Sequence, residues 1–381
     1  MKPRILLLAR ALDHGGSERQ LTEVALALDR ARFEPHVGAF HVEGIRAREL
    51  RSAGVPIKHL RVSSFLSPGA LTAAWDLRRY IHANAIQAIH TFDPPLTMWA
   101  IPSTRLLASA LAVSSQRSHL GLLPPSQRRL VVCAHRMAHG VVVNSEFLRR
   151  HLMEDAGVPA GRIHLCRNGI DLERFHSGAG IRPAALPPGG LTIGVVCVLR
   201  PVKGLPTLVD AFALVRHLAP GLRLAIVGSG PVLPELRRRA HELGVWDACV
   251  FEPSTDRVPD WLRNIDIFVL PSLSEGFSNA LMEALACGCC AIASRVGGNP
   301  ELIEDGVTGL LFEPGDVAGL ARALRETILN VELRRRLADA GHDLLHTRFS
   351  SAASARRMAE IYTELLSLRA GARKDTPFPV V

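Results

Sequence analysis

The sequence lacks several features that would each assign a function class. It has no run of eighteen uninterrupted apolar residues, and the best candidate for a membrane span, residues 96–113, is broken by Pro102 and Arg105. No Asp-x-Asp triplet, a common arrangement for holding a divalent metal, is found. The seven cysteines contain no pair of Cys-x-x-Cys units, which argues against zinc. We therefore expect neither a spanning helix nor a metal site.

Aromatic residues are also scarce. They make up 5% of the chain against 48% for apolar residues as a whole, so aliphatic side chains must build the cores. A length of 381 residues favours two domains of ordinary size. The first apolar run, Ile5–Ala9, is short, which favours a β-strand over a signal peptide. Together with the odd number of cysteines, this predicts a cytoplasmic protein.

The net charge of +9 is unevenly distributed along the chain. Residues 1–185 carry 24 Lys and Arg against 14 Asp and Glu, or +10, whereas residues 186–381 carry 21 against 22, or −1. The basic half would attract an anionic partner, such as a membrane surface or a phosphorylated acceptor. Its basic residues are not interleaved with aromatics, so we expect no nucleic acid partner. Peripheral contact with an anionic membrane is one expectation, and charge that only aids solubility is the alternative.

Short apolar runs alternate with amphipathic segments along the whole chain. This alternation predicts βαβ units, and therefore an α/β architecture with two doubly wound parallel sheets. The predicted strands are 5–8, 35–40, 55–60, 86–91, 110–115, 140–143, 192–198, 222–227, 250–251, 267–270, 291–293 and 309–312. The predicted helices include 18–28, 71–83, 206–218, 231–243, 279–286, 317–329 and 351–368. The predicted domains are 1–182 and 191–346, with a Pro- and Gly-rich linker 183–190, a last helical segment 347–368 and a loose tail 369–381.

Two loops that follow predicted strands of the second domain carry ionisable residues. Arg200 and Lys203 follow the first strand and could clamp one diphosphate, and Lys203 is one of only four lysines in the chain. Glu275 and Glu283 follow a later strand, eight positions apart across a Gly-containing turn. Open α/β sheets bind ligands at the carboxyl ends of their strands, so a site is expected here. Solvated loops are the alternative.

Backbone amides and glycines would complete such a site. Four residues at the start of a predicted helix offer N–H groups: Gly276, Phe277, Ser278 and Asn279. Gly15 and Gly16 open another helix after the first strand, where backbone could approach an anion closely. Gly228 and Gly230 end a further strand, but Leu233 stands where a dinucleotide fingerprint needs its third glycine. A nicotinamide site is therefore disfavoured, and plain turns remain the alternative for both glycine pairs.

Taken in order, these residues resemble the retaining glycosyltransferases of family 4, which have the GT-B fold. The resemblance extends over residues 4–365 and is most specific in the second half. The matching stretches are Gly15–Glu18, Val142–Ser145, Arg167–Asp171, Arg200 with Lys203 and Gly204, Val227–Pro231, Leu270–Phe277, the pair Glu275 and Glu283, Gly297–Glu301, and Asp305–Leu311.

The resemblance implies a function and a fold. The fold would be two Rossmann-like domains facing an interdomain cleft, with the last helix returning to the first domain. The activity would be transfer of a sugar from a UDP-, GDP- or ADP-sugar to an acceptor hydroxyl with retention of configuration, without a cofactor. The acceptor would be a sugar or a lipid-linked or phosphorylated molecule, as in glycan, envelope polysaccharide or glycolipid biosynthesis. A nucleotide-sugar epimerase or phosphorylase on the same scaffold, or a non-catalytic glycan- or membrane-binding module, is the alternative.

The same resemblance assigns roles to individual residues. Arg200 and Lys203 would hold the diphosphate, and Gly16 would close over it. Glu283 would bind the ribose and Glu275 the hydroxyls of the donor sugar. Since no nucleophile is well placed, we favour front-side attack, in which the diphosphate takes the proton of the acceptor. The loops that would select donor and acceptor are 65–69, 120–126 and 254–257, the last of which ends at Arg257.

One position departs from the family pattern. Relatives often carry a histidine at the end of the fifth strand of the first domain, where register places Arg117, and His119 lies two residues further on. Either side chain could reach the donor sugar or its phosphate. His90 ends the fourth strand and could line the acceptor side, although a structural histidine is the alternative.

Overall fold

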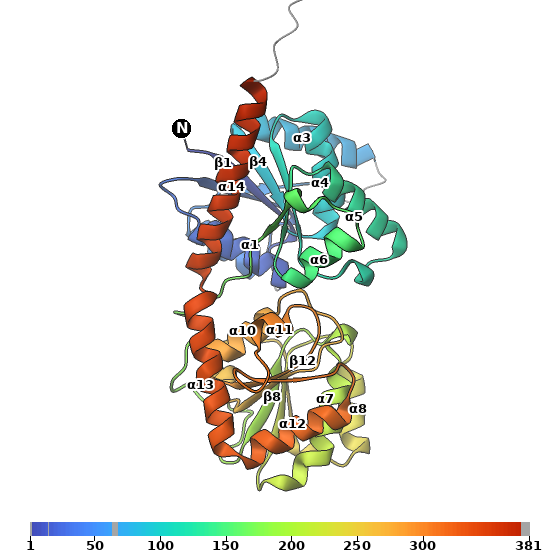
Figure 1. Ribbon diagram of the computed structural model, residues 1–381, viewed down its shortest axis with the longest axis vertical. Coiled ribbons are helices and arrows are strands. Elements are labelled where there is room, and N and C mark those ends of the chain that lie inside the picture. Colours follow the sequence, from blue (N-terminus) through green and yellow to red (C-terminus); the bar gives the residue numbers. More distant parts are fainter. Residues whose placement is uncertain (1, 14, 63–67, 375–381) are drawn as a thin grey trace, which may run out of the picture. The chain divides into compact units, whose positions relative to one another are not determined.

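The structure divides the chain into two compact units. The computed structural model describes residues 2–13, 15–62 and 68–374. Unit 1 contains the chain up to Gly169 and again from Ser351 onward, and unit 2 contains Ile170–Ser350. Figure 1 shows that each unit consists of a sheet covered by helices.

Unit 1 is built on a seven-stranded parallel sheet in the order β3-β2-β1-β4-β5-β6-β7. Its strands are β1 (Arg4–Ala11), β2 (Glu34–His41), β3 (Ile57–His59), β4 (Ile86–Thr91), β5 (Leu111–Gln116), β6 (Gly140–Val143) and β7 (Ile163–Leu165). Its helices are α1 (Gly16–Ala27), α2 (Ile45–Ser52), α3 (Pro68–Ala83), α4 (Pro94–Leu107), α5 (Pro125–Met137), α6 (Glu146–Glu154) and α14 (Ser351–Lys374), with short 3₁₀ turns η1 (Leu120–Leu122) and η2 (Ala160–Arg162).

The central strand β1 is buried on both faces. Ile5 and Leu7 belong to a core shared with α1, α2 and α14, whereas Leu6 and Leu8 belong to a second core shared with α3 and α4. Alternate residues of a strand point to opposite faces, so a run of aliphatic residues is what a two-sided parallel sheet requires. The same reasoning explains why β1 could be predicted from five apolar residues.

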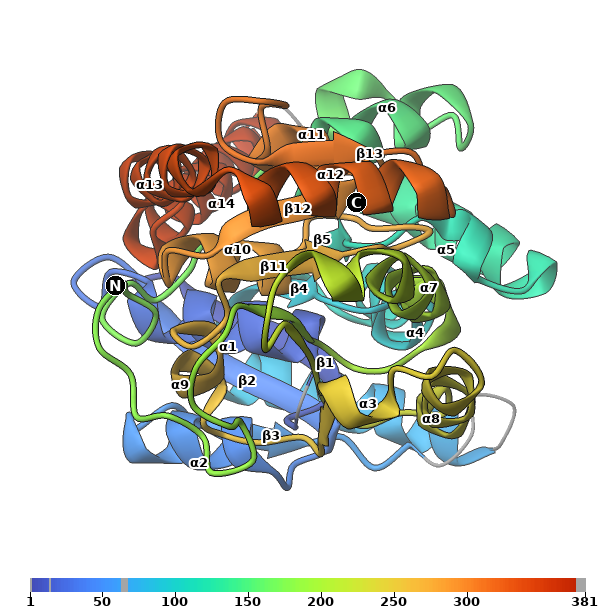
Figure 2. The same ribbon diagram turned by 90° about the horizontal axis from the view of Figure 1, so that it is seen from below.

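Unit 2 is built on a six-stranded parallel sheet in the order β10-β9-β8-β11-β12-β13. Its strands are β8 (Thr192–Val196), β9 (Arg223–Val227), β10 (Cys249–Glu252), β11 (Ile267–Leu270), β12 (Cys290–Ser294) and β13 (Leu310–Phe312). Its helices are α7 (Leu205–Val215), α8 (Leu233–Glu242), α9 (Val258–Leu262), α10 (Asn279–Ala286), α11 (Asn299–Leu302), α12 (Val317–Leu329) and α13 (Val331–Arg348), with 3₁₀ turns η3 (Pro201–Lys203), η4 (Arg216–Leu218) and η5 (Trp246–Ala248). Helices α7 and α12 lie side by side (Figure 2).

The predicted α/β architecture with two doubly wound sheets is confirmed, and each sheet reverses its strand order once. The reversal lies between β1 and β4 in unit 1 and between β8 and β11 in unit 2. Such a point is where open α/β sheets bind ligands, because the loops after the two strands diverge there. All twelve predicted strands overlap observed ones, and the observed β7 was not predicted.

The domain boundaries differ from the predicted ones. The segment 183–190 belongs to unit 2, where Leu186 is 2% exposed in the core and its carbonyl accepts from Arg182 Nε at 3.1 Å. The chain instead crosses between units after Gly169 and after Ser350. Proline and glycine indicate irregular backbone, but they do not show whether that backbone packs against a domain. This is why the segment 183–190 was wrongly predicted to be a linker.

The last helix, α14, is part of unit 1 and packs against α1. Its side chains Met358, Ile361 and Tyr362 are fully buried. It continues to Lys374, so residues 369–374 are helical and not a loose tail, while 375–381 lie outside the described residues. Residues 63–67 also lie outside them, and these include 65–67 of the predicted specificity loop 65–69. Within the described ranges, no helix is both long and apolar enough to cross a membrane.

Candidate functional site

The strand-order reversal of unit 2 brings two predicted loops together. The loop after β8 carries Lys203, and the loop after β11 carries Glu275. Leu273 N donates to the Val202 carbonyl at 2.8 Å, which fixes one loop on the other. Gly204 has φ +60°, and a Cβ there would lie 2.1 Å from the carbonyl oxygen of Pro271. Glycine is therefore required for this close approach.

An ion pair joins the two loops. Lys203 Nζ donates to Glu275 Oε1 at 2.5 Å, and the two side chains are only 19% and 11% exposed. Burial alone would lower the pKa of Lys203, but the Glu275 carboxylate outweighs it and the net pKa is raised. The ammonium group is therefore charged at neutral pH, held at the carboxyl edge of the sheet.

Ser272 holds the same carboxylate from the other side. Its hydroxyl donates to Glu275 Oε1 at 2.6 Å, so this oxygen accepts from both a lysine and a serine. The carbonyl of Ser272 accepts in turn from Ser294 Oγ at 2.5 Å, and Asn299 Nδ2 donates to the Ser294 carbonyl at 3.0 Å. Ser272, Ser294 and Asn299 are all fully buried. The position of Glu275 is thus set by a buried polar network.

Helix α10 starts immediately after this loop. Ser278 caps it by accepting from Leu281 N at 3.3 Å, and Asn279 is its first residue. The three residues that precede Asn279, namely Gly276, Phe277 and Ser278, are buried. Glu283 lies one turn into the helix with 8% exposure. The first-turn amides and two carboxylates therefore share one strand-to-helix junction, as the motif spacing predicted.

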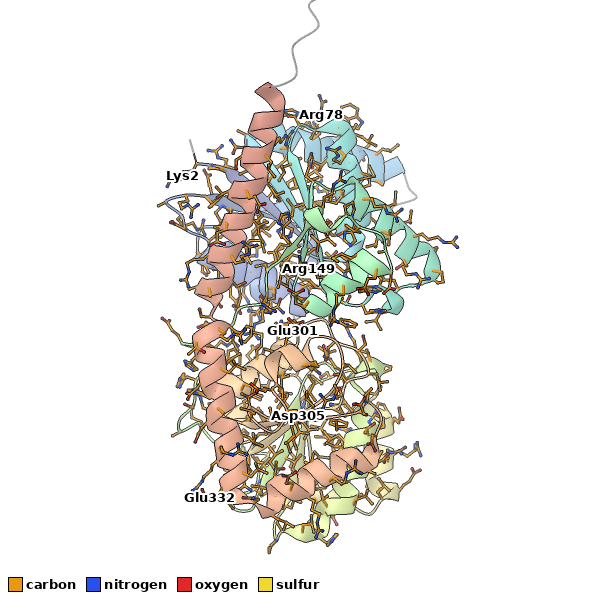
Figure 3. The ribbon with its side chains drawn as sticks, in the orientation of Figure 1. Lys2, Arg78, Arg149, Glu301, Asp305 and Glu332 are labelled. Carbon is orange, nitrogen blue, oxygen red and sulfur yellow. The ribbon has the colours of Figure 1, made fainter. Side chains whose placement is uncertain are left out.

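A second loop supports the junction from β12. Gly297 has φ +56°, and a Cβ there would lie 1.9 Å from the Glu275 carbonyl oxygen. Gly298 N donates to the Gly276 carbonyl at 2.9 Å. This loop leads into α11, which carries Glu301. Asp305 follows and forms an ion pair with Arg295 at 2.6 Å. Figure 3 labels Glu301 and Asp305. The glycines of the Gly297–Glu301 motif thus serve close backbone packing around Glu275.

Gly228 and Gly230 have a similar structural role. A Cβ at Gly228 would lie 1.9 Å from the carbonyl oxygen of Cys197, and one at Gly230 would lie 2.2 Å from that of Leu199. Leu199 N donates to the Ser229 carbonyl at 3.0 Å. These glycines let the loop after β9 pack against the loop after β8. This close packing explains why glycine stands at both positions, and no ligand is needed to explain it.

Two arginines of the predicted donor site are exposed. Arg200 is the residue before η3. Its positive charge acts to lower the pKa of Lys203, an effect that requires the two cations to lie close together. Arg257 N-caps α9 and pairs with Asp260 at 2.9 Å. The structure thus groups Arg200, Lys203 and Glu275 and keeps Arg257 in an ion pair of its own.

The predicted candidates of unit 1 fall into different surroundings. Gly16 opens α1 and is exposed. His90 is fully buried, with Nδ1 at 2.7 Å from Tyr362 Oη and Nε2 at 2.7 Å from Ser115 Oγ. Burial, and then the charge of Arg117, hold its pKa well below the ordinary value. His90 is therefore a neutral, internal histidine, and the acceptor-side role is not supported because neither ring nitrogen is accessible.

Arg117 and His119 both follow β5 but differ in environment. The Arg117 guanidinium lies 4.8 Å from the Phe92 ring centre and donates to Asn168 Oδ1 at 2.7 Å. Burial lowers its pKa to about 10. His119 is half-buried, and its Nδ1 accepts from Gly121 N at 3.0 Å. Both residues are partly buried, but Arg117 is held against Phe92 and Asn168, whereas His119 bonds to the turn that follows it.

Several residues of these sites were not singled out from the sequence. Ser272 is one, although it belongs to the Pro-Ser-x-x-Glu stretch. Asp93 is another: it caps α4, accepting from Leu96 N at 3.0 Å and also from Arg10 N, at the strand-order reversal of unit 1. Burial raises its pKa to about 6. An Asp directly before Pro94 at a helix start is a recognisable capping signal.

Comparison with known proteins places the chain among sugar-transferring enzymes. The family described as Glycosyl transferases group 1 matches residues 181–343, and Glycosyltransferase Family 4 matches residues 14–174. A D-inositol 3-phosphate glycosyltransferase of Catenulispora acidiphila is 32% identical over 70% of this chain and 66% of its own length. A GDP-mannose-dependent alpha-(1-6)-phosphatidylinositol monomannoside mannosyltransferase of Mycobacterium tuberculosis is 29% identical over 74% of this chain and 76% of its own length.

Solved structures show the same arrangement of elements. The structure of Anabaena HepE in complex with UDP-glucose matches with a TM-score of 0.83 at 22% identity, covering 95% of this chain and 99% of that one. A sucrose-phosphate synthase from Thermosynechococcus elongatus matches with a TM-score of 0.82 at 21% identity, covering 96% of this chain and all of that one. At these identities the likeness concerns the fold.

Proposed function

Because the chain belongs to the family 4 glycosyltransferases and has the GT-B fold, we propose that it transfers a sugar from a nucleoside diphosphate sugar to an acceptor hydroxyl with retention of anomeric configuration. The observation that carries this proposal is the junction after β11, where Glu275 is fixed by Lys203 and Ser272 beside the start of α10. This junction lies at the strand-order reversal, where the fold binds ligands.

The junction supplies what a departing nucleotide needs. Breaking the bond between the sugar and the diphosphate leaves negative charge on the phosphate oxygens, and fixed donors are the most effective way to stabilise it. Arg200 and Lys203 provide cations, and the first turn of α10 provides N–H groups with the positive end of the helix dipole. Glu275 then holds hydroxyls of the sugar and Glu283 those of the ribose.

These donors make a divalent metal unnecessary for transfer. A metal would have to be held beside the diphosphate by carboxylates, and the Lys203 ammonium already lies against the Glu275 carboxylate, where it supplies the positive charge that an ion would bring. The proposed transfer therefore uses Arg200, Lys203 and backbone amides alone.

The proposed chemistry is attack from the side on which the nucleotide leaves. The bond between C1 and the diphosphate oxygen breaks, and its electron pair stays on the diphosphate. The acceptor oxygen bonds to C1 on the same face, and its proton passes to the departing phosphate oxygen. Retention follows without a covalent intermediate, and the role of Lys203 is to stabilise the departing charge.

The acceptor is proposed to be phosphorylated or lipid-linked. The names of two relatives contain inositol 3-phosphate and phosphatidylinositol mannoside, both anionic. The first half of this chain is basic. On unit 1, α3 exposes Leu71 and Trp75. Arg78, which Figure 3 labels, lies on the same helix, and its guanidinium is 5.0 Å from the Trp75 ring centre. An apolar surface edged by arginine suits peripheral contact with an anionic membrane at the cytoplasmic face.

A donor screen followed by a transfer assay tests the proposal. Melting temperature is measured with UDP, GDP and ADP and with UDP-glucose, GDP-mannose and ADP-glucose. The best donor is then incubated with inositol phosphate or phosphatidylinositol vesicles in chelator. We expect one nucleotide to stabilise the protein and its sugar to be transferred only when acceptor is present. Epimerisation of the donor without acceptor, or the absence of any nucleotide binding, would contradict the proposal.

A further inference from the structure

A cavity of unit 1 lies between the edge strand β3 and α3, outside the proposed transfer site. Its volume is 520 Å³, which is within the range of binding sites for small ligands. Three of the residues that line it are cations, namely Lys58 on β3, Arg61 just after β3 and Arg79 on α3. Asp76 is the one carboxylate among its described lining residues, so these four side chains have a net charge of +2. We propose that this cavity binds the phosphate of an anionic phospholipid head group.

The three cations keep N–H groups available for a phosphate. Lys58 Nζ lies 2.6 Å from Asp76 Oδ2, and Arg79 Nη2 lies 3.2 Å from Asp76 Oδ1, so the carboxylate holds both cations at one wall. An ammonium has three N–H groups and a guanidinium has five, and each of these contacts uses one. Arg61 is exposed, and it forms no ion pair among the residues that the structure describes. Guanidinium forks beside a point charge suit phosphate recognition.

An apolar stripe on α3 indicates that the phosphate belongs to a lipid. Leu71 and Trp75 lie one turn apart on this helix and are 69% and 51% exposed. The residue after each of them, Thr72 and Asp76, lines the cavity. Successive residues of a helix are turned by about 100°, so the apolar stripe and the cavity wall are neighbouring strips of one helix. Apolar side chains inserted at the level of the head groups, next to cations, are typical of a surface that binds a bilayer.

The inference rests on the membrane contact proposed above and names the group that this contact recognises. Diffuse attraction between a basic protein and an anionic membrane depends on net charge and is screened by salt. A head group held in a cavity depends instead on the cations that line that cavity. The two kinds of binding therefore respond differently when a charge is moved from one place to another on unit 1.

Vesicle binding by the full-length protein, without nucleotide, tests the site. Vesicles of phosphatidylcholine are compared with vesicles of phosphatidylcholine and phosphatidic acid at one salt concentration. We expect the protein to bind the anionic vesicles, and Arg61→Gln should weaken this binding about tenfold through loss of a charged hydrogen bond. Brominated acyl chains should quench tryptophan fluorescence in the wild type, and this quenching should be lost in Trp75→Phe.

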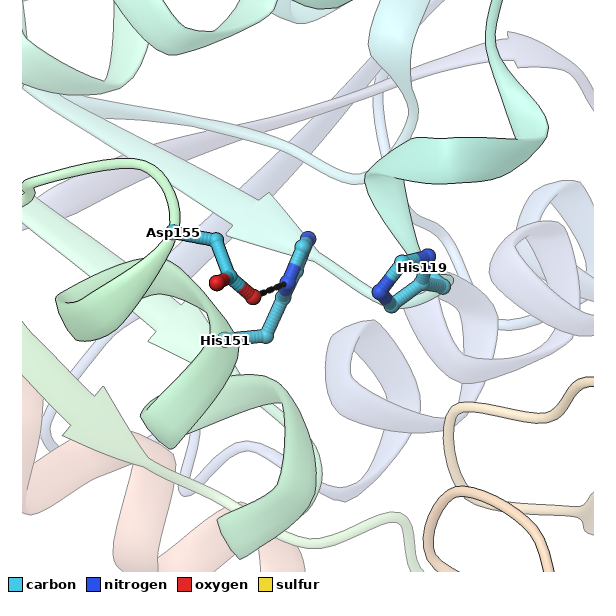
Figure 4. Close-up of side chains that lie close together, drawn as sticks. All are labelled: His119, His151 and Asp155. Carbon is cyan, nitrogen blue, oxygen red and sulfur yellow. Dashed lines mark hydrogen bonds and ion pairs between the residues drawn. The ribbon is translucent and has the colours of Figure 1, made fainter.

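Two control variants separate the cavity from net charge. Arg129→Gln removes an exposed arginine of α5 and should leave vesicle binding unchanged. Asp155, which is 67% exposed, follows α6 and faces His151 (Figure 4). Helix α6 packs on β6 and β7, and β6 is separated from β3 by roughly 24 Å of sheet. Adding Asp155→Asn to Arg61→Gln therefore restores the net charge but not the cavity, and the double variant should bind as weakly as Arg61→Gln.

Several results would overturn the proposal. One is equal binding to neutral and anionic vesicles, and another is a loss in Arg129→Gln as large as that in Arg61→Gln. Recovery of wild-type binding by the double variant would show diffuse attraction. Binding of glycerol 3-phosphate as tight as that of vesicles would assign the cavity to a soluble ligand.

A second variant and the melting temperature guard against misfolding. Thr72→Glu places a carboxylate at the cavity wall and should weaken vesicle binding as Arg61→Gln does, while both variants should melt as the wild type does. Wild-type vesicle binding by Thr72→Glu would also overturn the proposal. None of these readouts uses a nucleotide or an acceptor, so failure here and failure of the proposed sugar transfer are distinguishable.

Discussion

The pair of Lys203 and Glu275 gives the sharpest prediction about the site. At 2.5 Å and an effective dielectric constant of about 20, the two charges attract by about 7 kcal/mol before desolvation is subtracted. Removing one member of a buried pair costs about 3–5 kcal/mol, because the other charge is left uncompensated. Since these side chains keep 19% and 11% exposure, we expect Glu275→Gln to destabilise unit 2 by about 2–4 kcal/mol.

A double-mutant cycle isolates the pair from other effects of the substitution. Lys203→Met and Glu275→Gln should each destabilise, whereas the double variant should recover much of the loss. The assay is urea unfolding followed by Trp246 and Trp261 of unit 2, in a background where Trp75 and Trp99 of unit 1 are replaced by Phe. Reporting from one unit is needed because a chain of two units need not unfold in a single step.

The pH dependence of the pair has a definite sign. The folded pKa of Lys203 is raised above its unfolded value of 10.5, so its stabilisation is fully present below pH 10.5 and is lost as pH rises through the folded pKa. Stability from this pair should therefore be constant around neutral pH. A loss below about 0.5 kcal/mol in Glu275→Gln, together with additive effects in the double variant, would refute the reasoning.

Three further substitutions test other parts of the account. Ser272→Ala removes a hydrogen bond to the charged Glu275 that is worth about 1.5–3 kcal/mol, so the rate of transfer should fall roughly ten- to hundredfold. Ser272→Thr keeps the hydroxyl and should restore the rate. An unchanged rate in Ser272→Ala would exclude this positioning role. A residue other than glycine in the left-handed conformation of Gly204 costs roughly 1–2 kcal/mol. Gly204→Ala should lower the unfolding free energy of unit 2 by more than this, because the added Cβ would also collide with the Pro271 carbonyl. A smaller loss in urea unfolding would show that the two loops can separate. Asp93 has a pKa raised from 3.8 to about 6, so the folded state binds the proton more tightly and stability should fall by about 3 kcal/mol as pH rises from about 4 to 6. Asp93→Asn should flatten this slope, and an unchanged slope would assign it to another group.

The location of the site could be predicted because it depends on local patterns. Strands of unit 2 are short aliphatic runs, and the rule that ligands bind at their carboxyl ends selected the loops of Lys203 and Glu275. The sequence could not show that these two side chains bind each other. That contact depends on β8 and β11 being neighbours in the sheet, which is a property of strand order and not of either loop.

The sequence left two roles open for His90, acceptor contact and a structural histidine, and it could not decide between them for a similar reason. Its position at a strand end suggested access to a substrate. Its burial is completed by Tyr362 of α14, which is 272 residues away in sequence. The segment 183–190 was mistaken for a linker because composition reveals turns but not the packing of Leu186. Strand β7, with three residues, is too short to show a periodicity.

The most direct test of the central claim is the anomeric configuration of the product formed in the presence of chelator. The wild-type protein is incubated with its best nucleoside diphosphate sugar and an acceptor in excess EDTA, and the coupling constant of the new anomeric proton is measured by NMR. The account predicts undiminished transfer with the configuration of the donor retained. An inverted product, or transfer that requires added magnesium or manganese, would contradict it.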